Sequence, residues 1–169
     1  MRKEVVEFYE VQRFRQWWIW LTLILLNGVF VWGAVRQLVS EKPWGDNPMS
    51  DTGLLVFTLS MLLVSAAILS AKLKTYINKD GVYVQLFPYH FRYKFYGWST
   101  ISKAHVIKYS PLRAGGWGIK ISMDATKHYT VSGNMGLRLT LMNGRKVVIG
   151  TNKPDEMVNV LERLNKMKN

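Results

Sequence analysis

Two uncharged apolar runs decide the fold of this chain: QWWIWLTLILLNGVFVWGAV (Gln16–Val35) and TGLLVFTLSMLLVSAAILSA (Thr52–Ala71). Each run is 20 residues long, and the charged residues that bound them are Arg15, Arg36, Asp51 and Lys72. A helix rises about 1.5 Å per residue, so 20 residues reach about 30 Å, the thickness of a bilayer's hydrocarbon core. We therefore expect a transmembrane hairpin over residues 16–72, with spans 16–35 and 52–71 and a loop at 36–51.

The flanking residues predict how the hairpin lies in its membrane. Trp17, Trp18 and Trp20 crowd one end of the first run and Trp32 lies near the other, as in the aromatic belts of membrane proteins. Lys and Arg flank the hairpin, whereas residues 37–51 of the connection hold only Lys42 against three acidic residues. The positive-inside rule then predicts both termini in the cytoplasm, with the loop outside. We expect a multi-pass membrane protein with a retained anchor and no cleaved signal peptide.

Small and polar residues inside the runs predict where the two helices pack. Asn27 can form a hydrogen bond across the contact, and small residues four apart allow a close approach. The predicted packing positions are Asn27, Gly28, Ala66, Ala67, Ser70 and Ala71. Neither run contains an ionisable residue, so the sequence does not favour a channel or transporter that acts alone.

The N-terminal arm, residues 1–15, mixes charge with apolar residues at intervals of three: Val5, Phe8, Val11 and Phe14. This spacing predicts an apolar stripe on an interfacial helix that leads into the membrane. An arm that folds back onto the basic domain is the alternative. A further hypothesis is a recognition element built on Glu7 and Glu10.

The positive charge is concentrated behind the hairpin. The whole chain carries +12, and residues 72–169 hold 17 Lys and Arg against five Asp and Glu. Anionic lipid headgroups are the obvious counter-surface for a basic domain tethered to a membrane. Nucleic acid ranks lower, because the sequence shows no exposed aromatics arranged among the basic residues. The chain has no cysteine, which excludes disulfides and thiolate metal sites.

From Leu73 onward the sequence alternates with a period of two, which predicts strands. An Asn143-Gly144 pair between alternating segments predicts a tight hairpin. We count about seven strands, the last range being the two arms of that hairpin: Leu73–Asn78, Val82–Phe87, Phe91–Tyr96, Ala104–Tyr109, Trp117–Met123, His128–Val131 and Leu137–Gly150.

A C-terminal helix closes the chain. Asn152 or Lys153 can cap it, Pro154 suits its first turn, and acidic residues follow at the positive end of its dipole. Met157, Val160, Leu161 and Leu164 form a stripe that should be buried. Antiparallel strands closed by one amphipathic helix predict a small barrel or sandwich over residues 73–169. The fold class is therefore α+β: a two-helix transmembrane hairpin, then an antiparallel β domain capped by a helix.

Several segments carry a resemblance to a known group. They are GGWGIK (Gly115–Lys120), YTVSG (Tyr129–Gly133), GLRLTLMNGRKVVIGT (Gly136–Thr151), KPDEM and the leader EFYEVQRFRQWW (Glu7–Trp18). Together they resemble bacterial membrane proteins of unknown function with a pleckstrin-homology-like (PH-like) domain behind two membrane helices. The resemblance implies a PH-like fold at 73–169, and such folds bind lipid headgroups, peptides or proteins. Its motifs are structural, so they predict no activity.

The sequence shows no catalytic constellation. His90, His105 and His128 fall on different strands or turns, and Asp124 is the only acidic residue between Asp80 and Asp155. General acid–base chemistry commonly needs partnered titratable groups, so we expect no enzyme, no metal and no cofactor. Gly115–Gly118 precedes a strand and is too short for a dinucleotide fingerprint, so we interpret it as a tight connection that places Trp117 in the core.

What remains is a set of basic residues on the polar sides of strands and near the hairpin. The candidate contacts for lipid or a partner are Lys72, Lys74, Lys79, Arg92, Lys94, Lys108, Lys120 and Arg138. The first three are expected beside the membrane. We expect a non-enzymatic binding or scaffolding module at the inner leaflet, which contacts anionic lipid or a protein partner. The alternatives are an accessory subunit of a transport or export complex, a homo-oligomer, or a basic face that only confers solubility.

Overall fold

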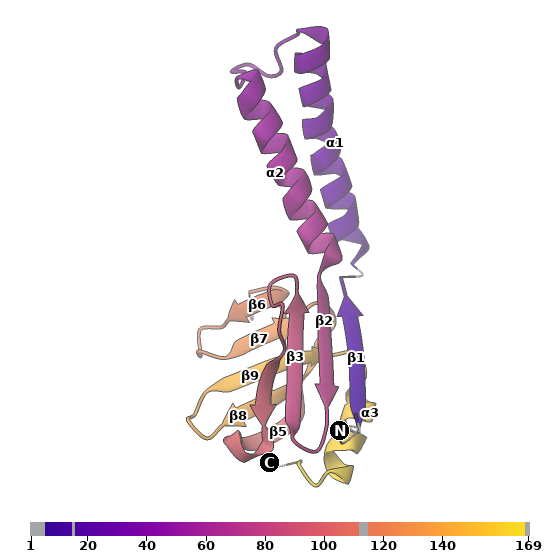
Figure 1. Cartoon of the computed structure of the whole chain (residues 1–169), viewed down its shortest axis with the longest axis vertical. Coiled ribbons are helices and arrows are strands. Elements are labelled where there is room, and N and C mark those ends of the chain that lie inside the picture. Colours follow the sequence, from indigo (N-terminus) through magenta and orange to yellow (C-terminus); the bar gives the residue numbers. More distant parts are fainter. Residues whose placement is uncertain (1–5, 15, 112–114, 168–169) are drawn as a thin grey trace. The chain divides into compact units, whose positions relative to one another are not determined.

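The computed structural model describes residues 6–14, 16–111 and 115–167, and in it the chain forms two compact units (Figure 1). One unit holds two long helices, α1 (Trp17–Ser40) and α2 (Asp51–Ser70). The other holds two β-sheets and the C-terminal helix α3 (Pro154–Arg163). The strand β1 (Phe8–Arg13) belongs to the second unit, although it precedes both long helices in the chain. The fold is therefore α+β, and the helical hairpin is inserted after the first strand of the β unit.

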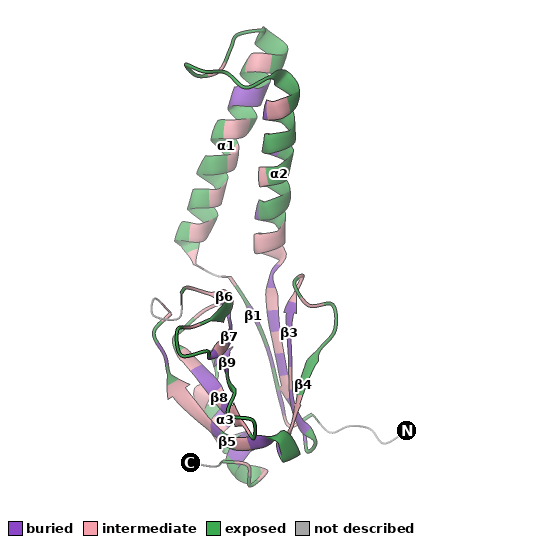
Figure 2. Cartoon of the chain, turned by 90° about the vertical axis from the view of Figure 1, so that its left-hand side faces the viewer, coloured by how far each residue is buried: buried purple, intermediate pink, exposed green. Residues whose placement is uncertain are grey.

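Both helices are long and apolar enough to cross a membrane. Most of their side chains are exposed in the chain itself, with Ile24 at 65% and Leu63 at 72% (Figure 2). A core helix of a water-soluble protein would bury such residues. Helix α1 continues past the apolar run to Ser40, so Arg36 is helical and its guanidinium lies 5.5 Å from the centroid of the Trp32 ring.

The helix–helix contact uses only part of the predicted set of residues. The Asn27 Nδ2 donates to Ser65 Oγ at 2.8 Å, so the hydrogen bond expected across the contact is present. A Cβ built on Gly28 would meet no atom within 4 Å, and Ala66 is exposed beside a cavity of about 260 Å³. The side chains that are buried in the two helices are those of Ala34, Leu54, Thr58 and Ser65. Ala71 is buried, but in the β unit rather than in the hairpin.

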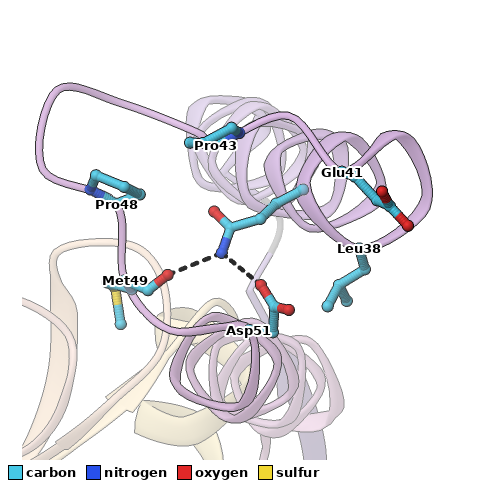
Figure 3. Close-up of a pocket in the computed structure, with 7 residues that line it drawn as sticks. Leu38, Glu41, Pro43, Pro48, Met49 and Asp51 are labelled. Carbon is cyan, nitrogen blue, oxygen red and sulfur yellow. Dashed lines mark hydrogen bonds between the residues drawn. The ribbon is translucent and has the colours of Figure 1, made fainter.

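The connection between the helices is organised by Gln37, which the sequence places in the loop but which lies in α1. Its Nε2 donates to the Met49 carbonyl and to Asp51 Oδ1, both at 2.8 Å (Figure 3). A cavity of about 420 Å³ lies beside these bonds. The Trp44 ring covers Gly33 so closely that a Cβ there would lie 2.5 Å from it. The loop is thus folded onto the helix ends by side-chain contacts.

The β unit consists of two sheets. The first has the order β1-β2-β3-β4 and is an antiparallel meander, with the strands β2 (Lys72–Ile77), β3 (Gly81–Phe87) and β4 (Lys94–Gly97). A short 3₁₀ turn, η1 (Trp98–Thr100), leads from it into the second sheet. The order of the second sheet is β5-β8-β9-β7-β6, and only its β7–β9 pair is parallel. Its strands are β5 (Ile101–Lys108), β6 (Gly118–Ile121), β7 (Lys127–Thr130), β8 (Met135–Leu141) and β9 (Lys146–Thr151).

The predicted strands after the hairpin are confirmed in position, with shifts of a few residues at their ends. Gly144 takes φ +78° in the turn between β8 and β9, as the Asn-Gly pair predicts. Helix α3 is confirmed too, with Met157, Val160 and Leu161 buried in the core. Lys153 is the N-cap residue, whereas the side chain of Asn152 bonds Ser132 and caps nothing.

The helix predicted for the arm is wrong, because this segment is β1. Phe8, Glu10 and Gln12 face inward, whereas Tyr9, Val11 and Arg13 face outward. The alternation of a strand was hidden because two of the three inward residues are polar. Of the predicted stripe, Val5 lies outside the described residues. The strand pairs with β2 along its whole length, so the alternative of an arm folded back onto the basic domain is what the structure shows.

Candidate interaction surface

The eight predicted basic residues do not form one face. Lys72 and Lys74 project from the outer side of β2, and Arg92 and Lys94 lie on the connection to β4 and at its start. Lys79 lies in the turn after β2, beyond the opposite end of a strand about 17 Å long. The other three belong to the second sheet: Lys108, Lys120 and Arg138. The sequence could not show this division, because it depends on which strands share a sheet.

A compact basic group lies where the first sheet meets the hairpin along the chain. Arg13 pairs with Lys72 across β1 and β2, and Lys74 follows on the same outer side. We call Arg13, Lys72 and Lys74 the basic end. The ion pairs found within residues 6–14, 16–111 and 115–167 involve other residues, namely Lys153 with Glu156 and Arg163 with Glu7. The cations of the basic end therefore have no carboxylate to neutralise them in the described part of the chain.

An aromatic row crosses the outer face of the same sheet. Strand register places Tyr9 opposite Tyr76, Tyr76 opposite Tyr83, and Tyr83 opposite Phe95. The rings of Tyr76 and Tyr83 stack at 4.2 Å, and the Phe95 ring lies 4.5 Å from Tyr83. Tyr9 and Phe95 are each 52% exposed. The row was missed because its first member was assigned to a helix and because cross-strand register is not visible in a sequence.

Nucleic acid ranked low because the sequence showed no exposed aromatics among the basic residues, and the aromatic row contradicts that reason. Exposed aromatics do lie among basic residues on this sheet. Their geometry is nevertheless poor for stacking bases, because the two central rings cover each other's faces. A single-stranded nucleic acid needs open ring faces on which successive bases can lie.

A second group of polar side chains lines a cavity of about 420 Å³ on the second sheet. Ser122 Oγ lies 3.2 Å from His128 Nε2 and donates to Asp124, whose other oxygen accepts from Thr126 Oγ1 at 2.7 Å. The bonds from Ser122 and Thr126 hold the pKa of Asp124 well below its usual range. Burial lowers the pKa of His128, so its imidazole is neutral near pH 7. Lys108, Tyr109 and Arg138 also line the cavity, as do Ser110 and Met123.

This group differs from a nucleophile triad in one decisive contact. In a triad the carboxylate accepts a hydrogen bond from the histidine and so orients it. Here Asp124 is bonded to the serine, and His128 Nδ1 is buried with no hydrogen-bond partner among the described residues. Asp124 therefore closes the β6–β7 turn and does not prepare a base. Within the described ranges no group of three His, Cys, Asp or Glu is placed to hold a metal ion.

Trp117 does not occupy the core position predicted for it. Its ring is only half-buried and its Nε1 lies 3.4 Å from the Gly133 carbonyl. The tryptophan of the core is Trp98, whose Nε1 donates to the Asn78 carbonyl at 3.0 Å. The glycines on both sides of Trp117 adopt positive φ at 115, 116 and 118, which fits the predicted tight connection.

Glu10 and Gln12 are internal residues that sequence reasoning did not place. Glu10 is 5% exposed, and its carboxylate accepts from Thr151 Oγ1 at 2.7 Å and from the Asn152 backbone N–H at 2.8 Å. Gln12 Nε2 donates to the Gly150 carbonyl at 2.6 Å. These bonds fasten β1 to the end of β9 and to Asn152, the residue that follows it. The hypothesis of a recognition element on Glu7 and Glu10 is wrong for Glu10, whose carboxylate is used inside the fold, and Glu7 pairs with Arg163.

A family model described as "Family of unknown function (DUF6141)" matches residues 2–164. The chain belongs to this family. A search of the curated proteins found no match. The family match covers β1, both long helices and the β unit as far as the end of α3, so the inserted hairpin lies within the matched region.

Proposed function

We propose that this DUF6141 protein is a membrane-anchored, non-enzymatic binding module whose β unit contacts anionic lipid headgroups at the cytoplasmic leaflet. In this proposal α1 and α2 span a bacterial inner membrane with both chain ends in the cytoplasm. The family match does not assign a function, so the support comes from the residues themselves.

The strand order supports a PH-like assignment of the β unit. The first sheet is a four-stranded antiparallel meander, and β5, β8 and β9 form a second antiparallel set before the C-terminal helix. These seven strands and one helix have the outline of a pleckstrin-homology fold. The β6–β7 hairpin is then an addition at the edge of the second sheet, and the membrane hairpin is an insertion between β1 and β2.

The single observation that carries the lipid proposal is the covalent position of the basic end. Three residues separate Arg13 from Trp17, the first residue of α1, and one residue separates Ser70 from Lys72. A chain advances at most about 3.6 Å per residue, so Arg13 and Lys72 lie within about 14 Å and 7 Å of the helix ends. Each cation near an anionic leaflet contributes about 1 kcal/mol to its attraction.

The test measures lipid binding by the full chain in a neutral detergent. Native mass spectrometry would follow titration with phosphatidylglycerol or phosphatidylcholine at low and high salt. We expect a preference for phosphatidylglycerol that salt weakens. The variant Arg13→Gln/Lys72→Gln/Lys74→Gln should bind phosphatidylglycerol at least about tenfold more weakly, because each tenfold loss requires only 1.4 kcal/mol.

A matched variant of the second sheet controls for total charge. Lys103→Gln/Lys120→Gln/Lys146→Gln removes three exposed lysines from that sheet and should keep most of the affinity. Equal losses in both variants would show that only net charge matters. No preference for phosphatidylglycerol would overturn lipid binding, and would leave the aromatic row as a surface suited to a protein partner in a larger complex.

A further inference from the structure

The connection between β3 and β4 is a second element at the hairpin end of the first sheet. We call Pro88–Tyr93 the aromatic loop. The register aligns Arg13, Lys72 and Phe87 across β1, β2 and β3, so the aromatic loop begins at the level of the basic end. Both connections to the helical hairpin leave the sheet from the same end.

The aromatic loop exposes large apolar side chains. Phe91 is 80% exposed, Tyr89 60% and Tyr93 39%, and the exposed Arg92 lies among them. A ring exposed to water lacks the stabilisation that burial of apolar surface provides. A cluster of exposed rings therefore marks a surface that contacts a protein or a membrane. Aromatic rings beside a cation suit the headgroup layer of a bilayer, where one side of the environment is apolar and the other is wet.

Hydrogen bonds fix the backbone of the aromatic loop in the conformation that exposes these rings. The His90 backbone N–H donates to the Leu86 carbonyl at 2.7 Å, and Gln85 Nε2 donates to the Phe91 carbonyl at 2.9 Å. The His90 ring turns inward, 5.8 Å from the ring of the buried Tyr129. Phe91 meets Phe87 only edge to face, with centroids 6.0 Å apart. The backbone is thus fixed while Tyr89 and Phe91 point to the solvent.

The turn at the opposite end of the same sheet is polar, although the aromatic row crosses the strands near that end. The β2–β3 turn contains Asn78, Lys79 and Asp80, and the Asn78 Oδ1 accepts from the backbone N–H groups of Asp80 and Gly81. Exposed aromatics of the sheet's loops therefore lie at the end joined to the hairpin, whereas the far turn is polar. An arrangement that served solubility alone would not require this difference.

We propose that the aromatic loop inserts Tyr89 and Phe91 into the headgroup layer of the bilayer that α1 and α2 span. The insertion holds the first sheet against the leaflet and brings the basic end to the lipid phosphates. This inference rests on the membrane placement in the proposed function, but not on a preference for anionic lipid. Aromatic insertion requires no headgroup charge, so it should also occur in a neutral bilayer.

The experiment uses the full chain, which has no cysteine of its own. A nitroxide is attached at Arg92→Cys or, as a control, at Lys79→Cys, and the protein is placed in phosphatidylcholine vesicles with or without phosphatidylglycerol. Collisions with a water-soluble nickel chelate and with oxygen report the depth of the label. We expect several-fold fewer nickel collisions and more oxygen collisions at position 92 than at position 79, in both lipids.

A second variant tests whether the rings cause the insertion. Tyr89→Ser/Phe91→Ser in the Arg92→Cys background should return the label to water, with no change for the Lys79→Cys label. Equal nickel access at the two positions would overturn the inference, as would shielding at 92 that survives the double substitution. Shielding in both lipids together with a failed phosphatidylglycerol titration would keep the inference and reject the anionic-lipid function.

Discussion

Glu10 and Gln12 show how single polar residues can join distant parts of a chain. They stand 138 or more residues away from the atoms they bind at the end of β9 and in the residue after it. Glu10 accepts two hydrogen bonds in the interior, and a charged acceptor forms stronger bonds than a neutral one. If the carboxylate is removed, the Thr151 hydroxyl and the Asn152 N–H lose their partner near the core.

We predict that Glu10→Ala lowers the free energy of unfolding of the β unit by about 1–3 kcal/mol, because it leaves two donors unsatisfied. Glu10→Gln should cost less, since the amide keeps one acceptor oxygen. Thermal unfolding in detergent, followed by tryptophan fluorescence, measures the effect through the buried Trp98.

The control for this prediction is Glu7→Gln, in the residue that precedes β1. Glu7 pairs with Arg163, whose side chain is 62% exposed, so the loss should stay below about 1 kcal/mol. An alanine at position 10 that destabilises no more than this control would show that the two internal hydrogen bonds contribute little.

At the scale of elements, the sequence predicts those helices and strands that short-range patterns determine. Strands such as β2 and β8 alternate apolar with polar residues, Gly144 supplies the positive φ of a hairpin, and Pro154 begins α3. Strand β1 escapes prediction because its polar inward residues satisfy bonds to partners far along the chain. The residues near β1 in the sequence do not reveal those partners. The spacing of three between its apolar residues therefore predicted a helix, although the true period of two is that of a strand.

The sequence predicted individual residues of the candidate surface, but not which of them lie together. Composition and charge point to Lys72 and Lys74, but the partnership of Lys72 with Arg13 needs the register of β1 on β2. The same holds for the aromatic row, whose members come from four strands. Lys79 was grouped with Lys72 because the two are close in sequence, whereas the full length of β2 separates them.

We predict that β1 is required for an independent β unit. A chain in which residues 6–14 are joined to residues 71–167 through Asn-Gly, in place of the helical hairpin, should be soluble, monomeric and cooperatively folded. The two-residue turn suits this junction because Arg13 and Lys72 already face each other in an antiparallel pair. Size-exclusion chromatography and circular dichroism measure the outcome.

Residues 72–167 alone are the comparison for that chain. Without β1 the edge of β2 is unpaired, and Thr151 loses the Glu10 carboxylate. We expect this shorter chain to aggregate, since exposed strand edges pair with other chains. A stable monomer of residues 72–167 would contradict an essential role for β1.

At the scale of the whole molecule, the two units are joined by two connections that leave the first sheet at paired residues. Arg13 and Lys72 are neighbours across β1 and β2, so the chain enters and leaves the hairpin at one place. In the proposed function, the orientation of α1 and α2 therefore decides which leaflet the basic end and the aromatic loop meet.

We predict that orientation from the loop charges, with the helix connection outside and the β unit in the cytoplasm. Because the chain has no cysteine, Asn47→Cys in the connection and Lys79→Cys in the β2–β3 turn each provide one labelling site. A membrane-impermeant maleimide should label position 47 at once when it is added to cells whose inner membrane is intact and whose outer barrier has been opened. Position 79 should react only after the membrane is permeabilised. Labelling of position 79 on intact cells would place the basic end against the external leaflet, where a contact with cytoplasmic anionic lipid is impossible.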